Sequence, residues 1–149
     1  MNRKAYNVKW YAIVPAMLAV VAVAVPVLMA RAPEIALALQ RAFALVCHQH
    51  ADRSFVLFGG SVAVCARCLG IYLGAAAGPL LRLPRQLATR LLFAAVAFNA
   101  VDSLAELAGL HGDWMLARFA LGCLLGMTGA MLVIASFNKV KLPPPVTAA

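Results

Sequence analysis

The sequence predicts an all-α, polytopic membrane protein with four transmembrane helices and one amphipathic interfacial helix. Of its 149 residues, 64% are apolar and only 12% are charged, and the mean hydropathy is +0.90. A soluble domain carries about a quarter charged residues, so this composition excludes the ordinary soluble class. Apolar stretches of about 20 residues, long enough to cross a bilayer as a helix, occur four times. Residues 1–149 are expected to form a single membrane domain.

The first predicted span covers residues 11–30 and follows a short basic stretch. A cleaved signal peptide is the alternative, but its apolar core is usually about 7 to 15 residues long. We therefore expect this longer stretch to be retained as a helix. Pro15 and Pro26 are compatible with a membrane helix, because neighbouring segments can satisfy the carbonyl groups that a proline leaves unpaired.

The next segment, residues 32–50, predicts an amphipathic helix at the membrane interface. Pro33 suits a first helical turn. Helical spacing places on one face the apolar residues Ile35, Leu39, Phe43 and Val46. Two polar residues interrupt its apolar part, which is also too short to cross the bilayer.

Three further spans are predicted at about residues 61–81, 91–110 and 114–137. The first and the last of them carry glycines at every fourth position, namely Gly70, Gly74, Gly78, Gly122 and Gly126. Such rows let a neighbouring helix approach closely, so they predict helix packing, including a homo-oligomer or a larger membrane complex. Residues 139–149 form a polar, proline-rich tail that we expect to be disordered.

The distribution of charge predicts the orientation of the spans. Four spans place both termini on one side, together with the second connection, and that side holds eight bases and no acids: Arg3, Lys4, Lys9, Arg82, Arg85, Arg90, Lys139 and Lys141. Lysine and arginine accumulate on the cytoplasmic side, so both termini are predicted to be cytoplasmic, in a bacterial inner membrane. The lipid bilayer is the expected partner. Nucleic acid is not, because no basic stripe is interleaved with aromatic residues.

Chemically reactive side chains are concentrated at the predicted outer face. Cys47 and two histidines occur in the segment CHQHADRSF, and His111 lies on the same side. Cys65 and Cys68 begin the second span, where the helix dipole favours thiolates. Three cysteines and one histidine are a common zinc ligand set, so we predict a site for zinc or another transition metal. Cys123 lies within the last span and is predicted to be a small packing residue.

Two other interpretations of the thiols stay open. Cys65 and Cys68 are spaced like the redox pair of a thiol-disulfide oxidoreductase. Four-helix enzymes of the disulfide-bond-forming and vitamin K epoxide reductase kind carry such a pair, but they need a second pair, and only Cys47 is available here. The cysteines could instead serve only structure, in an accessory subunit of a larger complex. The sequence therefore leaves open whether the chain is an enzyme.

A second polar group is predicted beneath the thiols. In the third span Asn99, Asp102 and Glu106 recur at spacings of three and four, which places them on one helix face. Arg118 of the fourth span is predicted to lie at about the same depth in the membrane as Glu106. Charged groups are costly there unless they pair or face a polar cavity. We predict either an ion pair that fixes helix register, or a polar pocket and second coordination shell that also includes Arg53.

Several short motifs also carry a resemblance to a known family. They are CHQ at 47–49, RSF at 53–55, CARCLGIYLG at 65–74, Asp102, Arg118 and the glycines at 122 and 126. Together they resemble small bacterial membrane proteins of domain of unknown function 2085, over about residues 44–130. The resemblance implies a helical membrane fold and functional importance of the motif positions, but no reaction. His50 falls outside the family pattern, so the resemblance favours His48 as the metal ligand.

Overall fold

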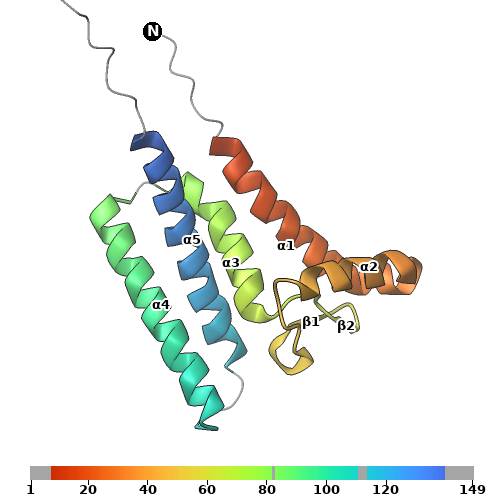
Figure 1. Ribbon diagram of the computed structural model, residues 1–149. Coiled ribbons are helices and arrows are strands. Elements are labelled where there is room, and N and C mark those ends of the chain that lie inside the picture. The colour runs from red at the N-terminus through yellow and green to blue at the C-terminus, as the bar shows by residue number, and fades with distance from the viewer. Residues whose placement is uncertain (1–7, 82, 111–113, 140–149) are drawn as a thin grey trace, which may run out of the picture.

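The computed structural model describes residues 8–81, 83–110 and 114–139 (Figure 1). Its elements, in chain order, are α1 (Val8–Arg31), α2 (Pro33–Ala44), η1 (Ala51–Arg53), β1 (Val56–Leu57), β2 (Gly60–Ser61), α3 (Ala66–Ala77), η2 (Gly78–Leu80), α4 (Arg85–Leu107) and α5 (Met115–Lys139). The predicted helical class is confirmed. Residues 140–149 of the predicted disordered tail, and His111, lie outside the described residues.

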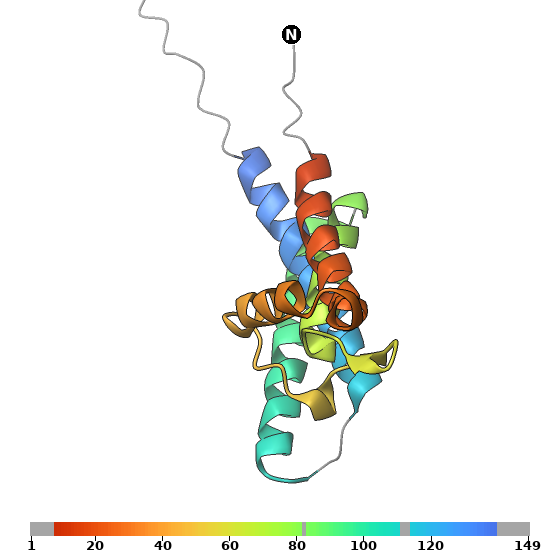
Figure 2. The ribbon, with the colours of Figure 1, turned by 90° about the vertical axis from the view of Figure 1, so that its right-hand side faces the viewer.

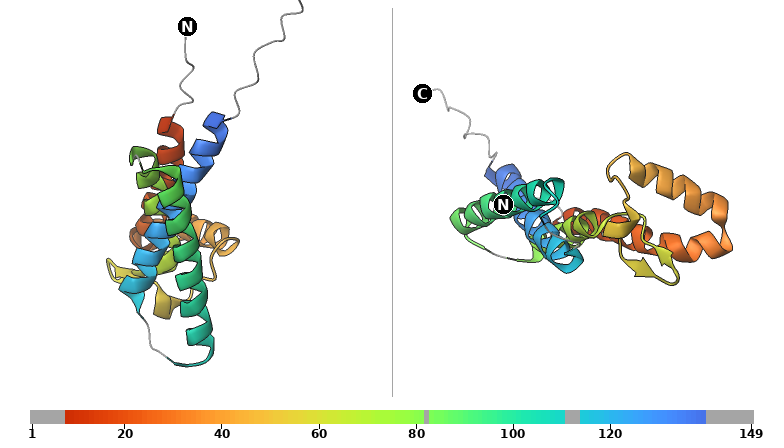
Figure 3. Two further views of the ribbon diagram at one scale, coloured as in Figure 1. Left: turned by 90° about the vertical axis from the view of Figure 1, so that its left-hand side faces the viewer. Right: turned by 90° about the horizontal axis from the view of Figure 1, so that it is seen from below.

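The helices α1, α3, α4 and α5 stand in one row rather than in a closed bundle. α3 packs between α1 and α5, and α5 also packs against α4. In Figure 1 the order across the row is therefore α4, α5, α3, α1, and Figure 2 looks along it. The neighbours α3 and α5 run parallel, as their glycine contacts show, and α1 and α4 at the two edges run the opposite way. The start of α1 and the end of α5 therefore lie at the same end. α2 and the β1–β2 hairpin project sideways from the α1 edge (Figure 3).

Three of the helices are long and apolar enough to cross a membrane: Trp10–Arg31, Arg85–Leu107 and Met115–Ser136. The predicted second span, residues 61–81, is shorter than expected, because only Ala66–Ala77 is α-helical. Ser61 belongs to the hairpin, residues 62–65 are non-helical, and Pro79 lies in the short η2 turn. At about 1.5 Å per residue, α3 covers about 18 Å of a hydrocarbon core of about 30 Å.

Pro26 gives α1 a point of attachment for the segment that leads to α3. A proline has no N–H, so the carbonyl of Ala22, four residues earlier, has no partner within the helix. The backbone N–H of Ala63 donates to this carbonyl at 3.2 Å. Gly60 lies against the same proline, since a Cβ there would stand 3.1 Å from Cβ of Pro26. At Pro26, the expected compensation by a neighbouring segment is confirmed.

α2 buries only part of its predicted apolar face against the protein. Phe43 is buried, but Ile35 and Val46 are 57% and 67% exposed. The residues turned inward are Ala36, which is fully buried, and the partly buried Leu39. α2 packs against α1, and a small residue at this contact lets the two helices approach closely. Leu39 and Phe43 of the predicted face therefore meet the protein, while Ile35 and Val46 are exposed, as suits a helix at the membrane interface.

The predicted glycine rows of α3 and α5 face each other within the chain. Added Cβ atoms at Gly70 and Gly74 would overlap carbonyl oxygens of α5, at Phe119 and Cys123. Added Cβ atoms at Gly122 and Gly126 would likewise overlap carbonyl oxygens of α3. This backbone-to-backbone contact is the small-residue packing typical of membrane helices. These four glycines are therefore used in folding rather than left free for a second copy.

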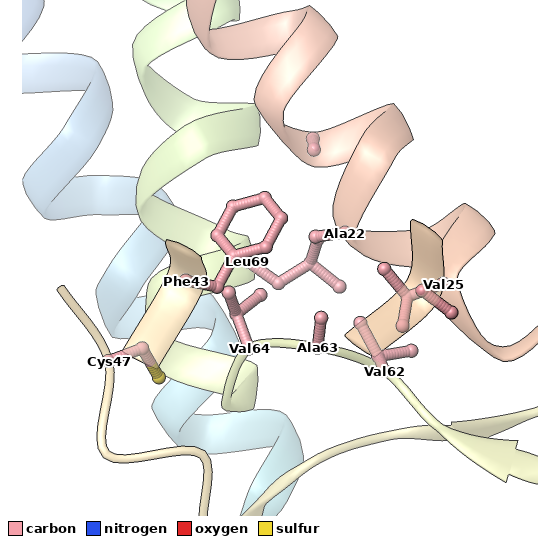
Figure 4. Packing of buried hydrophobic residues seen from close by; sticks show 10 residues of the cluster. Ala22, Val25, Phe43, Cys47, Val62, Ala63, Val64 and Leu69 are labelled. Carbon is pink, nitrogen blue, oxygen red and sulfur yellow. The ribbon is translucent and has the colours of Figure 1, made fainter. Parts of the chain in front are cut away.

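The largest cluster of buried apolar residues joins α1, α2, α3 and the non-helical segment that precedes α3. Val62, Ala63 and Val64 are at most 2% exposed, and they pack with Ala22, Phe43, Leu69 and Cys47 (Figure 4). This cluster fixes the path of residues 62–64. Because Cys47 belongs to it and Cys65 follows directly, the packing brings two distant parts of the sequence together.

Candidate metal centre

Three cysteines meet where α2 ends and α3 begins. Cys47 lies just after α2 and is 5% exposed, Cys65 is the N-cap residue of α3, and Cys68 lies in its first turn. Their sulfur atoms all lie within 4.8 Å of one another, and all four cysteines of the chain are free thiols. The backbone N–H of Cys65 donates to the sulfur of Cys47 at 3.2 Å. Cys123 is not part of this cluster.

Gln49 holds the loop of Cys47 against the segment that leads to Cys65. Its side-chain N–H₂ group donates to the carbonyl of Gln40 in α2 at 2.7 Å and to that of Ala63 at 2.8 Å. Gln49 has a φ of 52°, which is uncommon for a residue with a side chain. Sequence reasoning noted Gln49 only as a letter of the CHQ motif. Both of its acceptors are backbone carbonyls, so no side-chain pattern could have identified the role.

The surroundings of Cys47 favour its thiolate form. The pKa of Cys47 lies far below its ordinary value, first because the thiols of Cys65 and Cys68 donate hydrogen bonds to its sulfur. The backbone N–H groups of Cys65 and Gln49 add to this effect, whereas burial of the sulfur opposes it. A thiolate that accepts several hydrogen bonds is a ready metal ligand or nucleophile.

The histidines stand beside the thiol cluster but do not join it. His48 and His50 are exposed, and their rings stack with centroids 6.2 Å apart. Among the described residues, the cluster with mutual metal-ligand spacing contains the three sulfurs and no imidazole nitrogen. Both histidines line the same pocket as the thiols. The structure therefore brings together three of the four predicted ligands and leaves His48 at the rim.

The pocket that the thiols line has a volume of about 320 Å³. Its walls combine the three thiols and two imidazoles with charged side chains of η1, α3, α4 and α5, namely Arg53, Arg67, Glu106 and Arg118. The thiol cluster and the predicted polar group are thus two walls of one cavity.

The expected ion pair beneath the thiols is present and involves both carboxylates of α4. Arg118 of α5 is 3% exposed, and its Nε lies 3.2 Å from Asp102 while its Nη2 lies 3.2 Å from Glu106. Asp102 and Glu106 are one helical turn apart, which allows one guanidinium to bridge them. Asn99 does not share this role, since its amide donates to the carbonyl of Ala95 in its own helix.

Two further arginines extend the network to elements that precede α4. Arg53 of η1 pairs with Glu106 at 2.6 Å. Arg67 of α3 pairs with Asp102 and donates to the hydroxyl of Ser103 at 3.1 Å. Sequence reasoning noted Arg67 only as a letter of the CARCLGIYLG motif. Its position between two cysteines, at the start of an apolar helix, was the signal that could have identified it.

Ser54 supports the position of Arg53. This serine is 1% exposed, and its hydroxyl donates to the carbonyl of His50 at 2.9 Å. The next residue, Phe55, packs edge-on against Phe119 of α5, with centroids 5.6 Å apart. The RSF motif therefore closes the loop and anchors it to α5, so that Arg53 can reach α4.

The long apolar helices and the polar thiol pocket at one end define an integral membrane protein. Residues 47–132 match the family model described as predicted membrane protein, DUF2085. A protein of Methanocaldococcus jannaschii described as uncharacterised is 33% identical over 116 residues, which cover 71% of this chain and 72% of the relative. The chain belongs to the DUF2085 family, as its motifs indicated. No solved structure matches it.

Proposed function

We propose that this membrane protein binds zinc or a similar divalent transition metal through Cys47, Cys65 and Cys68. The observation that carries the proposal is the mutual approach of the three sulfurs within 4.8 Å. Sulfurs that bind one zinc ion at about 2.3 Å stand about 3.8 Å apart in a tetrahedral site. Small side-chain rotations therefore suffice to close the site around an ion.

The placement of the ligands supports a centre that also stabilises the fold. Cys47 and Cys65 are separated by 18 positions in sequence and belong to different segments. A bound ion would tie the loop after α2 to the start of α3, and its binding energy would contribute to the free energy of folding. Cys123 offers a matched comparison, because it is a thiol of the same chain that lies outside the cluster.

The test is metal analysis of the purified full chain, beside a count of alkylated thiols with and without reductant. We expect about one metal ion per chain. Cys65→Ser should lower both the metal content and the thermal midpoint, and Cys123→Ser should leave the metal content unchanged. If the wild-type protein takes up no divalent ion from chelator-free buffer, the proposal fails.

A thiol-disulfide exchange function is the second candidate. The low pKa of Cys47, next to the Cys65–Cys68 pair, favours it, because exchange requires a thiolate that attacks a disulfide. The Cys47 thiolate would attack an external disulfide or, once an external disulfide has oxidised Cys65 and Cys68, the bond between them. The same alkylation count distinguishes the two functions. A metal-free protein with a Cys65–Cys68 disulfide that exchanges with a dithiol would replace the metal proposal with this one.

The location proposed with this function is the outer face of the membrane. α1, α4 and α5 are three of the four crossings, and we assign the fourth to α3 with η2. α3 is short, but it packs between α1 and α5, and the non-helical residues 62–64 before it are buried in protein. Irregular backbone is tolerated at membrane depth where protein covers it. Four crossings then place both termini in the cytoplasm and the thiols outside.

A further inference from the structure

The thiol site borders a cavity rather than packed protein. A structural zinc site is closed by four protein ligands, whereas a site that takes exogenous ligands keeps three and leaves one position open. Among the described residues, three sulfurs form the cluster, and the same sulfurs line the pocket of about 320 Å³. We propose that the metal's fourth position faces this pocket and is taken by a small exogenous anion. This inference rests on the metal-binding function proposed above.

The guanidinium groups of the pocket wall supply the preference for an anion. Three arginines and one carboxylate, that of Glu106, line the pocket. Asp102 pairs with Arg67 and Arg118, and Asp52 lies 3.5 Å from Arg53, but neither carboxylate belongs to the lining. The Nε atoms of Arg53 and Arg67 are buried and have no hydrogen-bond partner among the described residues. An anion in the pocket would accept from such N–H groups.

Arg53 is the arginine best placed to contact such a ligand. Its side chain is 35% exposed, compared with 3% for Arg118, and it lies in a loop rather than within a packed helix. Its Nη2 atom is engaged with Glu106, while a guanidinium has five N–H donors in a planar fork. Glu106 also pairs with Arg118, so replacing Arg53 leaves this carboxylate with a cationic partner.

The experiment uses the full chain loaded with Co²⁺, whose d–d absorption bands report the coordination of the metal. Sodium azide is the probe. We expect azide to shift these bands with saturable dependence on concentration. Arg53→Gln should raise the azide Kd about tenfold, the usual effect of losing one hydrogen bond to a charged group. Arg53→Lys should recover part of the affinity. Arg41→Gln, at an exposed arginine of α2 outside the pocket, is the matched control and should leave the Kd unchanged.

His48→Ala separates an open site from a closed one. If azide leaves the wild-type bands unchanged but shifts those of His48→Ala, His48 is the fourth ligand and the inference is overturned while metal binding stands. Bands that ignore azide in both proteins also overturn it. An azide Kd that does not respond to Arg53→Gln overturns the anionic assignment. Failure of the wild-type chain to take up Co²⁺ would instead remove the proposed function itself, and the inference with it.

Discussion

Single residues connect segments of this chain that are distant in sequence. The carbonyl of Ala22, released by Pro26, accepts from the N–H of Ala63, and the carbonyl of Ala63 accepts from Gln49. The buried residue Ala63 thus joins α1 to the loop that carries Cys47. Ala63 also lies two positions before Cys65, the N-cap residue of α3. Buried polar groups of the backbone need such partners, so these bonds fix where the thiols meet.

Arg118 is the residue whose loss should affect stability most. Arg118→Ala removes the guanidinium that bridges two carboxylates and leaves Asp102 paired with Arg67 and Glu106 paired with Arg53. Removing one partner of a buried pair costs about 3 to 5 kcal/mol, and the remaining arginines bring the expected cost toward the lower end of that range. We expect a lower thermal midpoint and lower yield in detergent, measured beside Arg41→Ala as an exposed control. A variant as stable as the wild type would contradict the structural importance of the pair.

Gln49 should matter for the site more than for the global fold. Gln49→Ala removes two hydrogen bonds to backbone carbonyls, each worth about 1 kcal/mol. Because those bonds hold Cys47 next to Cys65, we expect a weaker affinity for Co²⁺ with helix content unchanged, measured by metal titration and circular dichroism. Equal metal affinity in the variant would show that core packing alone positions the loop.

At the scale of elements, the packing of the helices combines one close contact, between α3 and α5, with several looser ones. α3 and α5 touch through their backbones at glycines, while α4 packs mainly against α5. The ion pairs of Arg67 and Arg53 with α4 therefore connect α4 to elements beyond its neighbour. The polar network fixes the C-terminal end of α4 relative to the thiol pocket.

Gly74 and Gly129 give a matched test of this contact. Gly74→Ala would place a methyl group against the backbone of Cys123, so the two helices must separate. Overpacking of this kind costs about 1 to 3 kcal/mol, and we expect a corresponding loss of thermal stability in detergent. Gly129→Ala meets no atom within 4 Å and should be neutral or slightly stabilising. Equal effects of the two changes would show that helix propensity, rather than close packing, determines the change in stability.

At the scale of the whole molecule, the row of helices places the thiol cluster and its pocket at one end. The start of α1 and the end of α5 lie at the other end (Figure 1). The hairpin and α2 project beside the thiol end, and exposed apolar side chains lie on both, among them Phe58 at 75% and Leu37 at 46%. Such side chains suit the interfacial zone of a bilayer, where an amphipathic segment lies with one face in lipid.

The orientation in the membrane can be tested with reporter fusions. A reporter fused after Ala149 should be active only if it functions in the cytoplasm, because the basic residues gather on that side. A reporter inserted after Arg53 should give the opposite result, since this loop borders the thiol pocket. An extracytoplasmic signal from the first fusion would reverse the proposed topology and place the metal site in the cytoplasm.

The sequence by itself determined the class of protein, its family and most helix ranges. Composition and apolar runs are local properties, and a bilayer makes them decisive, because backbone hydrogen bonds in lipid must close within a helix. The sequence also identified the three thiols and the ion pair of Arg118, because reactive and charged residues are conspicuous in an apolar chain.

Only the tertiary structure decided how these parts meet. The path of residues 62–65 underlies several features that only the structure shows. They are the short α3, the buried face of α2, the position of His48 outside the thiol cluster and the pairing of Arg67 with Asp102. That path is set by contacts between residues far apart in sequence, such as Ala63 with Ala22. Helical spacing describes one segment at a time, so it cannot indicate which carbonyl, glycine or carboxylate another segment will reach.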